Sequence, residues 1–184
     1  MPHTSLKDKK VAFVVTNGYE DSELRSPWNA LRGAGASTVL VSPQTDEVSG
    51  VHGDSQAVDV LVADARAEDY DALVIPGGVQ NADKLRMDRD AVEFARGFFA
   101  QHKPVGAICH GAWLLVEADV VKGRTMTSYP SLATDLRNAG AAWIDEQVVT
   151  DHGLVTSRRP DDLEAFDSKL IEEVAEGEDA QQTA

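Results

Sequence analysis

The stretch PVGAICHGAW, residues 104–113, decides the fold of this 184-residue chain. Its first five residues carry no charge and are small or apolar, which is typical of a strand buried on both faces. Residues 111–117 continue as a predicted helix. Cys109 therefore lies where a buried strand turns sharply into a helix. This arrangement, a nucleophile elbow, holds one side chain at the carboxyl edge of a sheet.

Predicted strands and helices alternate along the rest of the chain. The pattern predicts strands at residues 11–16, 38–42 and 72–75 and helices at 22–35, 88–102, 131–139 and 163–174. It also predicts an edge hairpin within residues 43–62. A hairpin turn, Asp151-His152-Gly153, is expected between short strands at 148–149 and 154–155. Such alternation predicts an α/β fold in which a mostly parallel sheet lies between two helical layers. Ligands of these folds bind at the carboxyl ends of the strands.

Length and composition predict one globular domain over residues 9–175. A polar extension, residues 1–8, precedes it, and an acidic tail, residues 176–184, is expected to fray. The formal net charge of −14 argues against binding to nucleic acids or to anionic membranes, because both partners are negatively charged. No segment resembles a signal peptide or a membrane helix, so we expect a cytoplasmic location.

Cys109 is the only cysteine, which excludes an intrachain disulfide and the cysteine-rich zinc sites. His3, His52 and His102 are scattered and show no metal-ligand spacing, so we expect neither a metal nor a cofactor. A thiol at a helix N-terminus can have its pKa lowered from ~8.5 to about 3.5–7.5. A buried structural cysteine is the alternative, and the strand–turn–helix context favours the functional interpretation.

Four segments, in this order, resemble the PfpI branch of the ThiJ/PfpI superfamily, which has the class I glutamine amidotransferase-like fold. They are NGYEDSEL at residues 17–24, PGG at 76–78, AICHG at 107–111 and TSYP at 127–130. The resemblance covers residues 9–174, and SRRPDDL at 157–163 also fits it. It implies a single-domain, flavodoxin-like three-layer sandwich that assembles as a homodimer or hexamer.

Two positions depart from the family pattern or from that of its amidotransferase relatives. Ala112 stands where the family usually has proline, which loosens the start of the helix. True glutamine amidotransferases have a later histidine followed two residues on by glutamate. The later histidine here, His152, is followed by Gly153-Leu154, so we do not expect glutaminase activity.

The resemblance implies roles for residues around the cysteine. Glu23 would face Cys109 as a protonated carboxyl that donates a hydrogen bond to sulfur; the alternative is a glutamate favoured by the helix dipole. The backbone amides of Gly78 and His110 would form an oxyanion hole. His110 is either the base of a Cys-His-acid triad or contributes only its amide.

Three further residues have looser assignments from the resemblance. Asp83 would be the third, acidic member of the triad, if one inserted residue is allowed, and a neighbouring subunit often supplies it. Glu20 matches a second acidic position and could cap the helix at residues 22–35. Tyr129 could hydrogen-bond to substrate or to His110, or could be a core tyrosine.

The function implied by the resemblance is that of a stress-protective, cysteine-dependent hydrolase-like enzyme. Its substrates would be reactive carbonyls, either small dicarbonyls such as methylglyoxal or the adducts that they form on proteins and nucleotides (glyoxalase and deglycase activities). Intracellular peptidase activity is an older attribution for the family. Two alternatives stay open, namely a redox-responsive stress protein whose Cys109 is oxidised, and a chaperone-like module without turnover.

Overall fold

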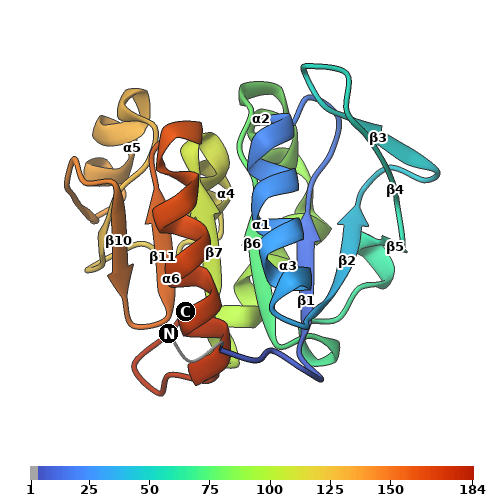
Figure 1. Ribbon diagram of the computed structural model, residues 1–184. Coiled ribbons are helices and arrows are strands. Elements are labelled where there is room, and N and C mark those ends of the chain that lie inside the picture. The colour runs from blue at the N-terminus through green and yellow to red at the C-terminus, as the bar shows by residue number, and fades with distance from the viewer. Residues whose placement is uncertain (1–3) are drawn as a thin grey trace.

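A seven-stranded sheet forms the middle layer of the protein (Figure 1). The computed structural model describes residues 4–184. All neighbouring strands of the sheet are parallel except β10 and β11, as the alternating sequence pattern predicts. In spatial order the strands are β10 (Val148–Asp151), β11 (Leu154–Ser157), β7 (Val105–Ile108), β6 (Ala72–Ile75), β1 (Lys10–Val14), β2 (Ser37–Ser42) and β5 (Val60–Leu61).

Helices cover both faces of this sheet (Figure 1). Helices α1 (Asp21–Gly33) and α6 (Leu163–Glu176) pack on one face, and α2 (Val79–Met87), α3 (Arg89–Ala100) and α4 (Ala112–Glu117) pack on the other. In β1, Val11 and Phe13 belong to the core under α1 and α6, whereas Ala12 and Val14 belong to the core under α3 and α4. Both clusters consist of buried apolar residues, which explains why the buried positions of the central strands are apolar on both faces.

The strand order changes direction at β1. From β1 the chain moves to β2 on one side, whereas the later strands β6 and β7 lie on the other side. Helix α1 follows β1, a PGG turn (residues 76–78) follows β6, and Cys109 follows β7. Because neighbouring parallel strands end at the same edge, these three connections meet there, at the place where α/β proteins bind their ligands.

The structure also contains elements that the sequence did not predict. Helix α2 follows the PGG turn directly, and its buried residues include the polar Asn81, so its apolar periodicity is weak. Strands β8 (Thr125–Met126) and β9 (Ala142–Trp143) form a separate two-stranded sheet and are too short to give a pattern. The hairpin predicted within residues 43–62 is present as β3 (Glu47–Ser49) and β4 (Ser55–Ala57), but it stands apart from the main sheet, whose edge is β5.

The predicted hairpin turn at residues 151–153 and the predicted helix at 131–139 are present, with shifted bounds. His152 and Gly153 both have positive φ, as a tight turn between β10 and β11 requires. Helix α5 spans Ala133–Asn138. The remaining elements are single 3₁₀ turns: η1 (Val62–Asp64), η2 (Ala67–Asp69), η3 (Cys109–Gly111), η4 (Pro130–Leu132) and η5 (Pro160–Asp162).

Both ends of the described chain pack against the domain. Leu6 is fully buried and belongs to the core under α1 and α6. The tail, expected to fray, instead folds back, because polar groups of Gln182 find buried partners. Its side chain donates to the carbonyl of Lys103, and Arg124 donates to the side-chain oxygen of Gln182 and to the carbonyl of Thr183. The prediction for residues 1–3 lies outside the described part of the chain.

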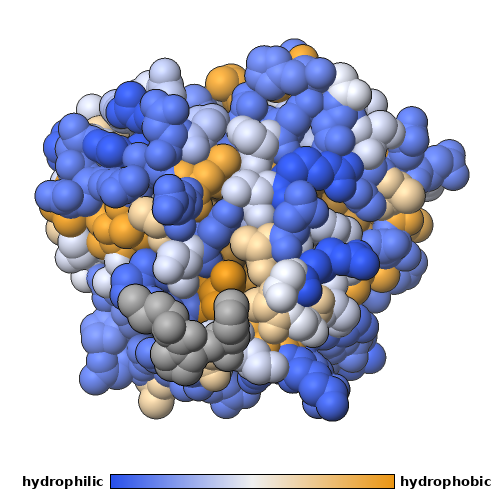
Figure 2. Space-filling model, in the orientation of Figure 1, coloured by the Kyte–Doolittle hydropathy of each residue, from blue (hydrophilic) through white to orange (hydrophobic). Residues whose placement is uncertain are grey.

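The face that carries α1 and α6 is mainly hydrophilic, with apolar residues in scattered patches (Figure 2). Within residues 4–184, no helix is both long enough and apolar enough to cross a membrane.

Candidate active site

Cys109 lies at the predicted elbow, directly after β7. Its φ of 61° is in the left-handed region, which is strained for a residue with a side chain and is found mainly at functional sites. The turn is tight because the neighbouring segments approach closely. A Cβ atom at Gly111 would lie 2.6 Å from the carbonyl oxygen of Ile75, so this position requires glycine. The two strands β6 and β7 therefore force the thiol up at the carboxyl edge of the sheet.

Glu23 comes from the first turn of α1 and faces the elbow from the neighbouring strand end. Its side chain is fully buried, and Oε2 accepts a hydrogen bond of 2.8 Å from the amide of Gly77. The other oxygen, Oε1, is buried without a hydrogen bond of standard geometry, and the carboxyl interacts with the Cys109 thiol. A Cβ at Gly77 would collide with the Glu23 carboxyl, so the glycine makes room for this approach.

The environment of Glu23 keeps its carboxyl group protonated. Burial raises the pKa of Glu23 to about 8, opposed by the hydrogen bonds from Gly77 and Cys109 and reinforced by the negative charge of Glu20. At neutral pH the carboxyl therefore holds its proton and can donate it in a hydrogen bond to the sulfur of Cys109.

The pKa of the Cys109 thiol is raised, whereas the position at a helix N-terminus led us to expect a lowered value. Burial is the main cause, and the charge of an ionised Glu23 adds to it, while the backbone amides of His110 and Gly78 lower the pKa. The repulsion from Glu23 disappears when Glu23 is protonated. The two groups thus titrate as a unit, and the thiolate is favoured only while the carboxyl keeps its proton.

His110 brings its ring, as well as its amide, to the sulfur. Nδ1 lies 3.2 Å from Sγ of Cys109. The ring stacks on Tyr129, with 4.8 Å between ring centroids, and meets the Trp113 ring edge-on at 5.4 Å. Burial lowers the pKa of His110, which favours the neutral imidazole. A neutral ring nitrogen at this distance can accept the thiol proton.

A pocket of about 440 Å³ opens over these groups. Its volume is in the range of small-molecule sites, roughly 300–1,000 Å³. The sulfur is therefore reachable although Cys109 is only 8% exposed. The pocket is lined by Glu20, Glu23, Val51, His52, Gly78, Val79, Gln80, Cys109, His110, Tyr129 and Pro160.

Glu20 and Tyr129 lie at the pocket, whereas Asp83 does not. Glu20 lines the pocket at the N-cap position of α1, but its side chain makes no capping bond and instead lies 3.2 Å from Nε2 of His52. Tyr129 is 39% exposed at the pocket and stacks on His110, so it is not a core residue. Asp83 is exposed on α2 and is not among the residues that line the pocket. Its role as a group supplied by a neighbouring subunit stays a prediction.

Asn81 supports the site, and sequence reasoning missed it. From α2 its Oδ1 accepts a hydrogen bond of 2.7 Å from the amide of Thr16, just after β1. Its Nδ2 donates to the carbonyls of Pro76 and Gly77 at 3.1 and 3.0 Å. One buried side chain thus ties the end of β1 to the PGG turn. No sequence signal marks it, because an asparagine in an unpredicted helix looks like a surface residue.

Within the described residues, no three His, Cys, Asp or Glu side chains are placed to hold a metal ion. The chemistry that this site can perform with its own groups is that of a thiol, a neutral imidazole, a protonated carboxyl and two backbone amides.

The sheet order and the elbow define an α/β protein that holds a cysteine at the carboxyl edge of a flavodoxin-like sheet. Comparison with known proteins identifies the family. The chain belongs to the DJ-1/PfpI family, whose sequence model matches residues 9–173.

Curated relatives cover nearly the whole chain. "Putative cysteine protease YraA" of Bacillus subtilis (strain 168) is 47% identical over 164 residues, which are 89% of this chain and 96% of YraA. The uncharacterized protein SAV1875 of Staphylococcus aureus (strain Mu50) is 45% identical over 169 residues, which are 90% of this chain and 98% of that protein.

Solved structures show the same fold. A two-domain protein of Anabaena variabilis with DJ-1/ThiJ/PfpI-like and ferritin-like domains matches with a TM-score of 0.87 and 36% identity. The match covers 90% of this chain but 48% of that protein, so this chain spans about half of its length. Schizosaccharomyces pombe DJ-1 matches with a TM-score of 0.79 and 25% identity, over 90% of this chain and 91% of the yeast protein.

Proposed function

We propose that the protein is a stress-protective, cysteine-dependent enzyme that acts on reactive carbonyl compounds. The substrates are dicarbonyls such as methylglyoxal, or the adducts that they form on proteins and nucleotides. The observation that carries the proposal is the position of Sγ of Cys109. It faces a pocket of about 440 Å³, with Nδ1 of His110 at 3.2 Å and a buried carboxyl beside it. A free cysteine is compatible with the reducing cytoplasm, where we expect the enzyme to act.

The reaction with methylglyoxal begins at the thiol. The Cys109 proton moves to Nδ1 of His110, and the sulfur adds to the aldehyde carbon, so that a C–S bond forms and the carbonyl π electrons move to oxygen. The amides of Gly78 and His110 interact with the sulfur and therefore lie beside this developing oxyanion. His110 then returns the proton to the oxygen, which gives a hemithioacetal.

The second half moves hydrogen within the substrate. Neutral His110 removes the proton from the sulfur-bearing carbon, which gives an enediolate, and returns it to the neighbouring carbon that was the ketone. The hydroxyl proton on the first carbon moves to the oxygen of the second, so that the first carbon becomes the carbonyl of a thioester of lactate. The first carbon is oxidised while the second is reduced, so no external oxidant is required. Water then cleaves the thioester, releasing lactate and the free thiol. Protonated Glu23 stabilises negative charge on the sulfur before the C–S bond forms and again when water releases the thiol.

The direct test is lactate formation from methylglyoxal by the wild-type protein and by the C109A variant. We expect the wild type to form lactate and the variant to be inactive. Equal rates in the two proteins would refute the proposal. The variant C109S, which keeps the shape of the side chain, separates loss of the nucleophile from a change in packing.

Peptide hydrolysis is the competing enzymatic function, because a relative 47% identical in sequence is named "Putative cysteine protease YraA". The pocket favours small substrates, since it is a compact site of about 440 Å³. A mixture of fluorogenic peptides decides between the two activities. Peptide cleavage that depends on Cys109, without lactate formation, would favour the protease.

Oxidation of the same sulfur is a second candidate function. A protonated carboxyl and two amides can donate hydrogen bonds to oxygens added to the sulfur. Intact mass after mild peroxide treatment tests this function. Stable addition of oxygen to the wild type but not to C109A would support it, and an unmodified thiol would contradict it.

Assembly is part of the proposal. We propose a homodimer or hexamer, in which Asp83 of a neighbouring subunit approaches the pocket. The exposed apolar residues on α2, Val79 at 55% and Met87 at 82%, support an interface near this helix. The mass of the native protein by light scattering gives the number of subunits, and a monomer would contradict this assembly.

A further inference from the structure

Ser131 is the polar neighbour of the nitrogen of His110 that does not face the sulfur. Nδ1 of His110 lies 3.2 Å from Sγ of Cys109, and Nε2 lies 3.5 Å from Oγ of Ser131. In the proposed reaction every proton passes through Nδ1. The partner of Nε2 is important as well, because the hydrogen bond that one ring nitrogen makes helps to set the protonation state of the other.

Two aromatic side chains hold the ring of His110 in place. It stacks on Tyr129 with 26° between the ring planes, and Trp113 meets it edge-on at 76°. The indole nitrogen of Trp113 donates to Oδ2 of Asp135 at 3.0 Å, so this second aromatic ring is fixed too. The imidazole therefore keeps Nδ1 toward the sulfur and Nε2 toward Ser131.

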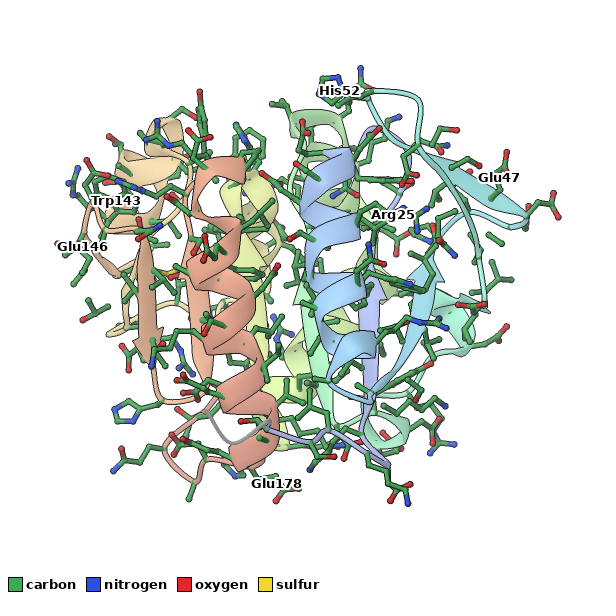
Figure 3. All side chains as sticks on the ribbon, viewed as in Figure 1. Arg25, Glu47, His52, Trp143, Glu146 and Glu178 are labelled. Atoms are coloured by element: carbon green, nitrogen blue, oxygen red, sulfur yellow. The ribbon has the colours of Figure 1, made fainter. Side chains whose placement is uncertain are left out.

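The segment that carries Ser131 is attached to the elbow. The amide of Tyr129 donates to the carbonyl of Cys109 at 3.2 Å. The hydroxyl of Ser128 donates to the carbonyl of Tyr129 at 2.9 Å and accepts from Nε1 of Trp143 at 3.0 Å. Trp143 lies on the side of the molecule that carries α5 and β10 (Figure 3). These bonds fix the backbone just before Ser131, so its hydroxyl is pre-positioned although the residue is exposed.

The charged groups around the ring do not take the place of this hydroxyl. The titratable side chains near His110 and its aromatic neighbours are those of Glu20, Glu23, His52, Arg86, Cys109 and Asp135. Within residues 4–184, the histidine rings that pair with carboxylates are those of His52 and His152, not that of His110. Burial lowers the pKa of His110, so a proton on its ring is costly unless Nε2–H has an acceptor.

We propose that Ser131 is a positioning residue for the reaction at Cys109, and that it accepts a hydrogen bond from Nε2–H of His110 while the ring holds the thiol proton. In that step the S–H bond breaks, its electron pair stays on sulfur, and an N–H bond forms at Nδ1.

The hydroxyl of Ser131 stabilises the charged ring more than the neutral one. It can donate to or accept from a neutral imidazole, whereas an imidazolium has only donors. Hydrogen bonds from a charged donor are shorter and stronger, so the contact of 3.5 Å tightens as the proton arrives. Ser131 thereby favours the thiolate–imidazolium pair over the neutral thiol and imidazole. Its effect on turnover rests on the proposed function, whereas its effect on the thiol does not.

Two variants at residue 131 test the hydroxyl. S131A removes it and S131T keeps it, and the control T134A removes another exposed hydroxyl, in α5. The rate at which iodoacetamide alkylates Cys109 measures the thiolate without any substrate. We expect S131A to react roughly tenfold more slowly at pH 7, the effect of losing one hydrogen bond to a charged group. The pH profile of its alkylation should move upward by about one unit. S131T and T134A should stay within about twofold of the wild type.

Turnover gives a second measurement. In lactate formation from methylglyoxal, kcat of S131A should fall roughly tenfold while KM stays within about twofold, because the hydroxyl acts on the proton transfer and not on the substrate. If the wild-type protein forms no lactate, the proposed function fails, and alkylation alone decides the role of Ser131.

Three results would overturn the role of Ser131. Equal alkylation rates for S131A and the wild type would show that water replaces the hydroxyl. An equal loss in S131A and S131T, or the same loss in T134A, would show an effect of packing. Slower alkylation in D83N but not in S131A would show that a carboxylate of a neighbouring subunit holds Nε2 instead.

Discussion

The buried proton of Glu23 predicts how the stability of the fold depends on pH. Burial raises the pKa of this carboxyl from 4.5 to about 8 in the folded protein. The unfolded chain ionises it near the ordinary value, so between these two pH values the folded state holds a proton that the unfolded state has released. The stability contributed by this proton is fully present below about pH 4.5 and is lost as the pH rises through about 8.

The size of the effect follows from the two pKa values. Their difference of about 3.5 corresponds to at most about 5 kcal/mol of unfolding free energy, at about 1.4 kcal/mol for each pKa unit. Replacing Glu23 by Gln keeps an acceptor for the Gly77 amide and removes the ionisation. We expect the E23Q variant to be more stable than the wild type by several kcal/mol at pH 8, and the two to agree within about 1 kcal/mol at pH 5.

Urea denaturation followed by circular dichroism measures both proteins at intervals from pH 5 to pH 8. The exposed Glu47 of β3 provides the control, because E47Q should run parallel to the wild type across this range. A constant difference between wild type and E23Q at every pH would refute the reasoning. It would show that Glu23 titrates in the folded protein as it does in the unfolded chain.

Three further predictions concern the support of the site. In G77A, the new Cβ would collide with the Glu23 carboxyl and lie 2.8 Å from Cβ of Cys109, so we expect the thermal midpoint to fall by about 5 °C; an unchanged midpoint would show that the PGG turn can shift. In N81A, the amide of Thr16 and two carbonyls lose their buried partner, so the unfolding free energy measured in urea should fall by about 2–4 kcal/mol. A loss no larger than that of the exposed control N138A would contradict the role of Asn81 in joining β1 to the PGG turn. In D83N, we expect kcat for methylglyoxal to fall while light scattering shows the same mass; an unchanged kcat would remove Asp83 from the site.

Much of this fold could be predicted because its local patterns agree with one another. The residues from Val11 to Val14 are apolar at every position, and the structure buries alternate ones in two separate cores. The helix at residues 163–174 shows an apolar stripe, which packs beside α1. Short or partly polar elements were not predicted. Strands β8 and β9 have two residues each, and α2 buries the polar Asn81, so none of them shows an apolar periodicity.

The site was predictable in part, because three of its segments directly follow predicted strands. The elbow at Cys109, the glycines after β6 and the acidic start of α1 all follow strands that neighbour one another in the sheet. Their meeting follows from the topology, since parallel strands end at one edge. His52 could not be predicted in the same way, because a hairpin outside the main sheet brings it to the pocket. The bonds from Asp21 to its loop join residues about 30 positions apart in the chain.

The sequence by itself determined the α/β architecture, the position of the single thiol and the negative net charge, because strand periodicity, one cysteine and the charged residues are properties of the chain. Only the tertiary structure decided the charge state of that sulfur and its partners. Burial raises the pKa of Glu23 and of Cys109 together, which opposes the lowered thiol pKa that the helix start suggested. Desolvation depends on every segment packed around a group, and no local pattern in the chain records it.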